Sequence, residues 1–560
     1  MSQTMALFLC VLLPISMSHA STPTDALWAE KFIPETSALI AIPTHDDPTH
    51  PAHRVKNLTR VKIQLQQWAT AFNQQLQHDQ LQAFEWQKRI DGKDYWLFGF
   101  RLGRGAHKIA MLTHVDTVPP GQSDWQPYQA RIEKREYLGE KQVDFLVGRG
   151  AMDNKGPAIS AFIVLRRLAQ QYDGADVLNQ VTLELIFDTS EETDMATPHY
   201  LKDAGTDAPD FGIVFDAMWC VRAEKGIERP VFRVSKTPHN TTKLWIEHLQ
   251  STPGPVNQIP SSAQAVIKSA DPVALSAFYQ TVLKQYQTFS VEPAGYRRAR
   301  MDAPIWRDNA VLLTTHVLGA QHGSAPQENL AAGANPLVSL SYFLGGLVEQ
   351  QTLAANAQGV MAVFMRWLWG THVFGEGHEA LQAFDAVFEP GNGTTYALTQ
   401  VQADSSAVRL HVDIRYAMPH HSTPWDGQTE GVLPGKSRFQ AIFKPLLARF
   451  NQRYPLFPVR VATHTAYGPD IRLPSNAYFT RVNQAYQAVM GEPCQFIGIG
   501  GGTDAKGHPE LLAVGALFSP DLGPPVNFHG DNEGAPLPHL RKSTQILYQI
   551  LANELEHKVK

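Results

Sequence analysis

The stretch Lys108–Asp116 places the strongest constraint on the fold, because it joins a buried strand to a pair of polar side chains. It reads Lys-Ile-Ala-Met-Leu-Thr-His-Val-Asp, and its apolar run predicts a buried strand. His114 and Asp116 follow two residues apart, so they share one side of an extended chain. Strand ends that open into loops are where α/β folds place their chemistry. Alone, the pair also fits a histidine that is satisfied by its own neighbour.

Three further acidic clusters follow strand-like runs or begin helix-like ones. Asp153 lies in Gly-Arg-Gly-Ala-Met-Asp-Asn-Lys-Gly near the start of a predicted helix, Glu191 and Glu192 end a strand-like run, and Asp216 ends another. His529 lies far away in Asn-Phe-His-Gly-Asp-Asn-Glu-Gly. Carboxylates gathered with imidazoles at one sheet edge repel one another unless a cation lies among them. Mixed nitrogen and oxygen ligands suit zinc or, less selectively, cobalt or manganese.

Together, the series His-x-Asp, Gly-x-x-Asp-x-Lys-Gly, Glu-Glu, Asp and a late His resembles the M20 metallopeptidases, which use two zinc ions. The resemblance covers most of the chain after its N-terminal residues. It implies that Asp153 bridges the two metals, that His114 and Asp216 hold one of them, and that Glu192 and His529 hold the other. The cofactors expected from it are two Zn²⁺ ions, with Co²⁺ or Mn²⁺ as alternatives.

The resemblance also implies the catalytic groups. Glu191 is expected to be the general base that takes a proton from a metal-activated water and delivers it to the leaving amine. Asp116 would orient the His114 imidazole or shape the base. His322 lies in a segment that is similar to the family's His-x-Ser-x-Pro, in which the histidine reaches over the zinc pair and stabilises the oxyanion. A surface histidine is the alternative for His322.

Four residues are expected to bind substrate. Arg415, in Val-Asp-Ile-Arg-Tyr, suits a clamp that holds a substrate carboxylate by two parallel hydrogen bonds, although a structural arginine fits the same pattern. Asn257 lies in a segment that matches a lid motif of the family. Gly502 ends a glycine run that can bring backbone N–H groups close to a ligand, and Thr503 follows it. A phosphate-binding loop is excluded there, because the run lacks a Gly-Lys-Ser/Thr ending.

The N-terminal residues and the cysteines indicate where the protein is located. A short apolar run followed by Ser-His-Ala predicts a signal peptide over residues 1–20, cut after Ala20, and hence a periplasmic or secreted protein. No Lys or Arg precedes the run, and a buried N-terminal helix is the alternative. No other long apolar stretch predicts membrane insertion. Cys220 and Cys494 remain after cleavage; we expect two isolated core thiols, with a single bridge as the alternative.

The length of 560 residues requires more than one core. We expect an α/β catalytic domain, a sheet with helices on both faces, formed by residues 21–231 and 467–560. An α+β lid domain, residues 232–466, is inserted between these parts and exceeds the size of a common domain. Members that resemble a bacterial broad-specificity dipeptidase (PepV-like) have a doubled lid that mimics a second subunit. A doubled lid and a monomer are therefore expected, with a homodimer as the alternative.

The periodicity also predicts individual elements. Tyr95–Leu102 and Lys108–Thr113 are expected to be neighbouring strands, and helices are expected at Asn57–His78, Asn476–Met490 and Leu540–Leu555.

The sequence thus predicts an exported two-zinc peptidase that cleaves dipeptides or short peptides. A related amidohydrolase that removes an acyl group from an amino acid would use the same metals. A catalytically inactive peptide-binding protein is the third hypothesis, which the presence of Glu191 and all five expected ligands disfavours. The net charge of -5 gives no basic footprint for nucleic acid.

Overall fold

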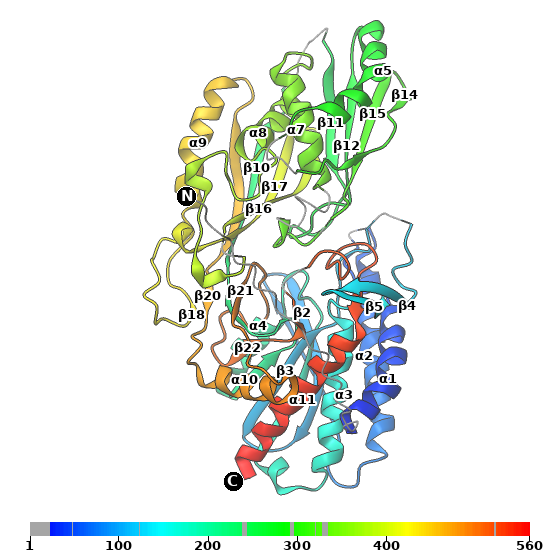
Figure 1. Cartoon of the computed structure of the whole chain (residues 1–560), viewed down its shortest axis with the longest axis vertical. Helices are drawn as coiled ribbons and strands as arrows, with labels where there is room; N and C mark the ends of the chain where they lie inside the picture. The colour runs from blue at the N-terminus through cyan, green and yellow to red at the C-terminus, as the bar shows by residue number, and fades with distance from the viewer. Residues whose placement is uncertain are drawn as a thin grey trace, which may run out of the picture.

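The computed structural model describes residues 23–47, 49–121, 124–237, 243–291, 296–319, 321–326, 334–391, 393–519 and 522–559. The expected signal peptide, residues 1–20, lies outside the described residues. The chain forms two parts, one above the other in Figure 1, and the N-terminal and C-terminal thirds of the sequence meet in the lower part. No helix in the described ranges is both long enough and apolar enough to cross a membrane.

A six-stranded sheet forms the centre of the lower part, in the order β1-β2-β6-β3-β7-β22. All eight residues of β6 are buried, as expected for a strand covered on both faces. Parallel pairing joins β6, β3, β7 and β22, whereas β1 and β2 run antiparallel at one edge. The strands are β1 Gln82–Ile90, β2 Lys93–Gly103, β3 His107–His114, β6 Val181–Asp188, β7 Phe211–Val214 and β22 Leu511–Ala513.

The expectation that β2 and β3 are neighbours is wrong, because β6 lies between them. The short link between β2 and β3 crosses the start of β6, where the Arg104 N–H donates to the Leu178 carbonyl at 2.8 Å. Gly105 packs so closely there that a Cβ atom would lie 1.7 Å from the backbone carbon of Gln180. A glycine therefore allows the link to skip one strand.

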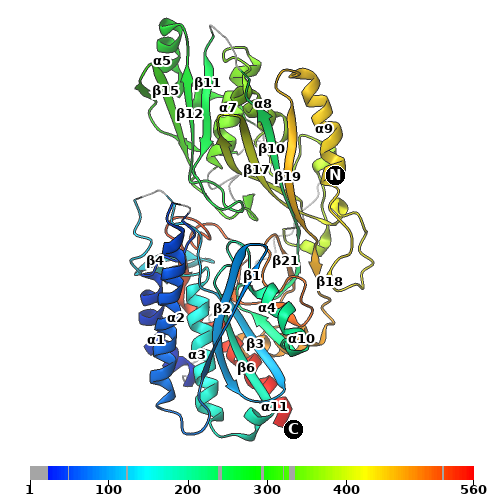
Figure 2. The ribbon, with the colours of Figure 1, turned by 180° about the vertical axis from the view of Figure 1, so that it is seen from behind.

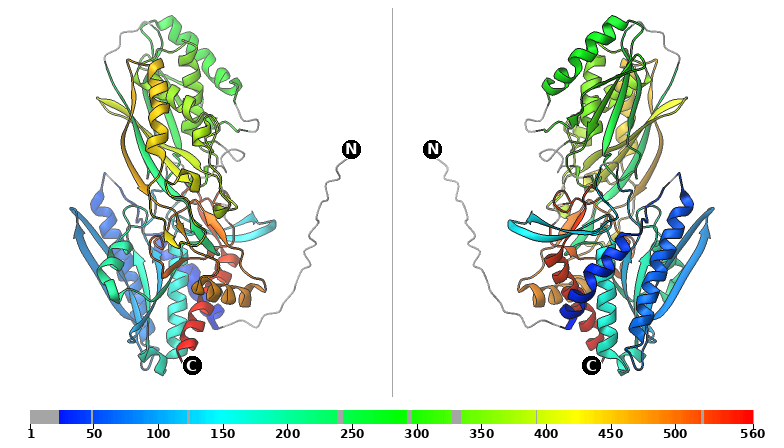
Figure 3. Two further views of the ribbon diagram at one scale, coloured as in Figure 1. Left: turned by 90° about the vertical axis from the view of Figure 1, so that its left-hand side faces the viewer. Right: turned by 90° about the vertical axis from the view of Figure 1, so that its right-hand side faces the viewer.

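Helices cover both faces of this sheet, which agrees with the predicted α/β class. Along β2, Phe100 stacks on Phe162 of α3, with ring centroids 5.3 Å apart. Arg101 points the other way, because successive side chains alternate between faces, and it contacts Tyr200 of α4. Figures 2 and 3 show the helices on the two sides of the sheet. The helices of this part are α1 Pro23–Ile40, α2 Pro51–Asn73, α3 Lys155–Tyr172, α4 Thr197–Ala204, α10 Ala477–Met490 and α11 Leu537–Val559.

Small sheets surround the central one. A hairpin of β4 and β5 pairs with β24, and β21 pairs in parallel with β9. The strands in these sheets are β4 Arg131–Tyr137, β5 Glu140–Val147, β8 Ala217–Met218, β9 Val221–Glu224, β18 Gly431–Val432, β20 Asp470–Ile471, β21 Ile497–Ile499, β23 Ala516–Leu517 and β24 Gly534–Pro536.

The upper part contains two antiparallel sheets with their own apolar core. They meet edge to edge where the Val401 N–H of β16 donates to Ser251 Oγ of β11 at 3.0 Å. Two sheets agree with a doubled lid, while the bounds 232 and 466 stay a prediction. The first sheet has β16 Thr395–Ala403, β17 Ala407–Tyr416, β10 Gly226–Ser235 and β19 Val459–Tyr467; the second has β11 Trp245–Ser251, β12 Ser262–Lys268, β15 Ala310–His316, β13 Arg300–Met301 and β14 Ile305–Arg307. The helices are α5 Pro272–Thr288, α7 Pro336–Glu349, α8 Ala357–Leu368 and α9 Phe439–Arg453.

Cys220 and Cys494 form a disulfide that closes a sequence separation of 274 residues. The expectation of two isolated thiols is therefore wrong. Cys220 directly precedes β9, and its carbonyl accepts a hydrogen bond from the Ile497 N–H at the start of β21. The parallel pairing of β9 and β21 brings the two cysteines together, and nothing local in the sequence indicates that pairing.

Candidate active site

A cavity of about 1390 Å³ lies between the two parts and receives side chains from both. Its lower wall contains the acidic residues that follow the strands of the central sheet. Its upper wall comes from β10, β17 and the loops around Asn257 and His322. The predicted site residues that line it are Asp153, Glu191, Glu192, Asp216, Asn257, His322, Arg415, Gly502, Thr503 and His529.

His114 lies at the end of β3, below the cavity, with its side chain 1% exposed. Its Nδ1 is 3.1 Å from the carbonyl oxygen of Asp116, and a carbonyl can only accept, so Nδ1 carries the proton. Nε2 therefore faces Asp153 Oδ1 at 3.0 Å and Asp216 Oδ2 at 3.5 Å. This is the orientation that a metal-binding imidazole needs.

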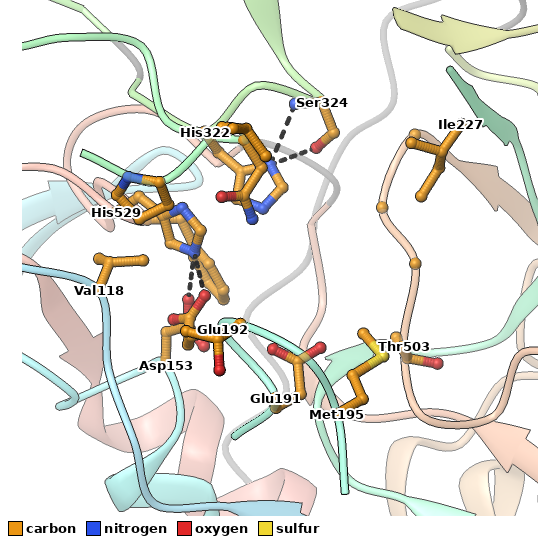
Figure 4. Close-up of a pocket in the computed structure, with 18 of the residues that line it drawn as sticks. Val118, Asp153, Glu191, Glu192, Met195, Ile227, His322, Ser324, Thr503 and His529 are labelled. Carbon is orange, nitrogen blue, oxygen red and sulfur yellow. Dashed lines mark hydrogen bonds and ion pairs between the residues drawn. The ribbon is translucent and has the colours of Figure 1, made fainter. Parts of the chain in front are cut away.

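Asp153 lies between His114 and His529 and contacts each with a different oxygen; Figure 4 shows the contact with His529. Its Oδ1 is 3.0 Å from His114 Nε2, and its Oδ2 is 3.0 Å from His529 Nε2. The residue stands just before α3, in a turn whose N–H groups of Met152 and Asp153 donate to Glu533 Oε1. Glu533 is itself buried and paired with Arg149 at 2.7 Å. The turn thus places the two oxygens of the Asp153 carboxylate against two different histidines, His114 and His529.

Glu191 and Glu192 lie in the turn that follows β6, and Asp116 holds this turn in place. The backbone N–H groups of Glu191 and Glu192 donate to the two oxygens of the Asp116 carboxylate, each at 3.2 Å. Arg54, from α2, donates to Asp116 and to the Thr189 carbonyl. Asp116 therefore orients the acidic pair as well as standing 3.4 Å from His114 Nδ1.

The two glutamates face different neighbours. Glu192 Oε2 is 3.3 Å from His529 Nε2, whereas Glu191 Oε2 lies 4.0 Å from His114 Nε2. The potential ligand atoms form two groups in which all atoms lie within 4.8 Å: His114, Asp153 and Asp216, and Asp153, Glu192 and His529. Glu191 belongs to neither group and remains directed to the cavity.

The electrostatics of these groups fit bound cations. Burial and neighbouring carboxylates raise the pKa of Glu192 and of Asp216 above their ordinary values. Glu192 Oε1 and His529 Nδ1 are buried and have no hydrogen-bond partner among the residues that the structure describes. Buried carboxylates of this kind are costly without a compensating charge. Two nitrogen-and-oxygen donor sets that share one aspartate fit a pair of divalent metal ions.

His322 reaches the cavity from the upper part, with its ring 4.4 Å from that of His529 between centroids. Its Nδ1 accepts hydrogen bonds from the Ser324 N–H at 3.1 Å and lies 2.5 Å from Ser324 Oγ (Figure 4). Because a backbone N–H can only donate, the proton of the neutral ring is on Nε2. Burial and the nearby His529 hold the pKa of His322 well below its ordinary value. His322 is thus a neutral donor at the cavity.

Arg415 lines the cavity but is only 2% exposed, because Asp413 engages it. Its Nε and Nη2 donate to the Asp413 carboxylate at 2.8–3.1 Å, and its Nη1 donates to the Gly500 carbonyl at 2.8 Å. The guanidinium has N–H groups left for a ligand, but its charge is already compensated. The expected carboxylate clamp therefore includes a buried aspartate.

The glycine-rich segment and Asn257 also reach the cavity. Gly502 and Thr503 both line it, and the Thr503 hydroxyl donates to the buried Glu224 at 2.7 Å. Asn257 accepts the Gly323 N–H at its carbonyl, at 2.6 Å. This bond fixes the loop that carries His322.

Several residues of the site were not identified from the sequence. Asp413 lies two residues before Arg415 and Glu533 lies four residues after His529, each within the same motif. A search of these motifs for acidic partners of buried arginines could have found them. Arg54 and Arg229 lie in no motif, and only the tertiary fold brings them to the site.

The family of the chain follows from comparison with known proteins. A model of the family described as Peptidase family M20/M25/M40 matches residues 110–553. A Staphylococcus aureus protein (strain bovine RF122 / ET3-1) named "Putative dipeptidase SAB1611c" is 24% identical over 423 residues, which are 74% of this chain and 77% of that protein.

Two solved structures are similar at lower identity. Human carnosine dipeptidase 1 is 13% identical, with a TM-score of 0.47, and the match covers 95% of this chain and 97% of that one. The dipeptidase Dug1p from Saccharomyces cerevisiae is 12% identical, with the same TM-score and coverage. Since the family model spans most of the sequence, the chain belongs to peptidase family M20/M25/M40.

Proposed function

We propose that this protein is a two-zinc dipeptidase. The observation that carries the proposal is the arrangement around Asp153, which lies between two histidines and joins two potential ligand groups, while Glu191 stays outside both. The names of the relatives, which describe dipeptidases, support this substrate class over N-acyl amino acids. Zinc suits the donor set, and Co²⁺ or Mn²⁺ could replace it.

The metals would be held by His114, Asp153 and Asp216 on one side and by Asp153, Glu192 and His529 on the other. When bound, two such ions supply the positive charge that lowers the pKa of a water and polarises the scissile carbonyl. The residues of the chain perform the proton transfers around that chemistry.

Glu191 acts as the general base and then as the general acid. Burial raises the pKa of its carboxyl well above the ordinary value, and its position outside the ligand groups leaves an oxygen to accept a proton from the attacking water. The same carboxyl then delivers that proton to the leaving amine. Asp116 acts as a positioning residue, because its carboxylate holds the backbone of Glu191 and its carbonyl holds the tautomer of His114.

The upper wall binds the substrate. His322 donates its Nε2 proton to the oxygen that gains negative charge. Arg415, which Asp413 holds in place, forms the part of the cavity that receives the substrate carboxylate, and Asn257, Gly502 and Thr503 shape the wall beside it. Because the candidate metal-binding residues and Arg415 line the same cavity, we expect it to select short peptides that fit between them.

We also propose that the protein is exported and acts as a monomer. The disulfide between Cys220 and Cys494 supports export, because disulfides persist in oxidising compartments. A mass measurement of the exported protein tests cleavage after Ala20. We expect the mass of a chain that begins at Ser21. Both walls of the cavity come from one chain, so we expect light scattering to give the mass of one chain; a stable dimer would contradict this.

The experiment that tests the function compares dipeptides, tripeptides and N-acetyl amino acids. We expect cleavage of dipeptides, its loss with a chelator, and recovery on adding zinc. Deacylation of N-acetyl amino acids without cleavage of dipeptides would change the proposed substrate class but leave the proposed mechanism unchanged. Binding of a dipeptide without turnover in any metal would overturn the enzyme and leave a peptide-binding protein.

A further inference from the structure

The sheet face that closes the cavity from above carries two arginines around one aspartate. Ile227 of β10 lies opposite Arg415 of β17, and the same antiparallel register places Arg229 opposite Asp413. Directly opposed residues point to the same face of a sheet. Ile227, Arg229 and Arg415 all line the cavity, and Figure 4 shows Ile227 across it from Asp153.

The two arginines differ in how strongly the protein holds them. Arg415 is 2% exposed and makes several bonds of 2.8–3.1 Å to Asp413 and Gly500. Arg229 is 26% exposed, and its one ion pair within the described part of the chain is a contact of 3.5 Å between its Nε and Asp413 Oδ1. Its remaining N–H groups are available to a ligand in the cavity.

The charge of this cluster follows from the same contacts. Asp413 is fully buried and compensates Arg415, so that pair is neutral. Arg229 adds one positive charge that no described carboxylate fully balances. One anionic group of a substrate would therefore complete the cluster, and a guanidinium binds a carboxylate more strongly than a neutral donor does.

We propose that Arg229 is a specificity-determining residue: it supplies the uncompensated charge that makes a free C-terminal carboxylate necessary in the substrate. Arg415 contributes N–H groups to the same part of the cavity, while Asp413 contacts both guanidinium groups and fixes their positions. The inference rests on the proposed dipeptidase function. It assigns the discrimination between peptides and their C-terminal amides to Arg229.

The test compares Ala-Ala with the amide of Ala-Ala, using zinc-loaded protein. For Arg229→Gln we expect kcat/KM on the free peptide to fall about 10-fold or more, mainly through KM, with little change on the amide. Arg229→Lys, which keeps the charge, should retain most of the preference. Arg233→Gln is the matched control, because Arg233 lies on the same strand and bonds Ser235.

Equal losses on the free peptide and the amide, or no loss on either, would overturn the assignment to Arg229. A melting temperature close to that of the unsubstituted protein excludes misfolding as the cause. If no dipeptide is hydrolysed at all, the proposed function fails, yet the inference can still be decided by binding. Calorimetry with Glu191→Ala protein should then show that Arg229→Gln weakens the binding of the peptide about 10-fold but not that of its amide.

Discussion

The two walls of the cavity differ in how their buried charges are compensated. On the lower wall, carboxylates follow strand ends, and their neighbours leave Glu192 Oε1 without a hydrogen-bond partner among the described residues. On the upper wall, Asp413 lies within a sheet and is compensated by Arg415. The lower wall therefore depends on cations from outside the chain, whereas the upper wall supplies its own. This difference predicts that substitutions in the lower wall reduce catalysis, whereas substitutions in the sheet of the upper wall reduce stability and substrate binding.

The largest effect is expected for Glu191→Gln on the lower wall. Loss of the proton-transferring carboxyl should lower kcat about 10³-fold, within the usual range for general acid–base groups. Metal content should not change, because Glu191 lies outside both ligand groups. Steady-state kinetics and elemental analysis of the same sample check both points. Glu192→Gln is the contrasting variant, since it should lose metal; equal metal loss in both variants would contradict the distinction between the glutamates.

The upper wall should respond to Asp413→Asn with lost stability. Removing the buried carboxylate leaves the Arg415 guanidinium without a counter-charge, which costs about 3 kcal/mol in the free energy of unfolding. Denaturant unfolding of the zinc-loaded protein measures this cost. Asp404→Asn is the control, because Asp404 pairs with Arg409 at an exposed position and its pairing should contribute little. If Asp413→Asn were as stable as the control, the buried pair would not support the wall.

His322 belongs to the upper part but faces the chemistry of the lower wall. His322→Ala should lower kcat about 10²-fold, the effect of removing one donor to an oxyanion, with metal content unchanged. Ser324→Ala removes the hydroxyl 2.5 Å from Nδ1 but keeps the backbone N–H that fixes the tautomer. We therefore expect a much smaller loss of kcat for Ser324→Ala. A similar loss in both variants would show that the hydroxyl, and not the backbone, sets the tautomer.

The lower wall was more accessible to sequence reasoning than the upper one. Each of its acidic residues ends an apolar run or begins a helix, so local periodicity located them, and the family resemblance grouped them. The predicted helices occur as α2, α10 and α11, with bounds that differ by several residues at most. The upper wall depends on strand register: Arg229 meets Asp413 only because β10 pairs with β17, and no local pattern indicates that pairing.

The two wrong expectations have the same cause. The strand order around β6 depends on the close approach of Gly105 to Gln180, and the disulfide depends on the pairing of β9 with β21. Both are contacts between segments far apart in the sequence. Composition and periodicity describe single segments, so they left these contacts open.

The smallest effects should come from the helix caps, and these ask whether the two parts unfold together. Asp271 caps α5 of the upper part through the Val273 N–H at 2.8 Å, and Asn476 caps α10 of the lower part through the Tyr478 N–H at 2.9 Å. Each Ala substitution should cost about 1 kcal/mol, without changing kcat/KM. Asn476→Ala should cost somewhat more, because the Asn476 amide also donates to Glu430.

Calorimetric unfolding distinguishes the two outcomes. If the walls belong to one cooperative unit, both substitutions shift a single transition. If they unfold separately, Asp271→Ala moves only one of two transitions, and a chelator moves only the other, because metals that bind the lower wall stabilise it by mass action. Contacts such as the Arg415 bond to the Gly500 carbonyl link the parts, so we expect one transition in the zinc-loaded protein. Two transitions there would show that the two parts unfold independently.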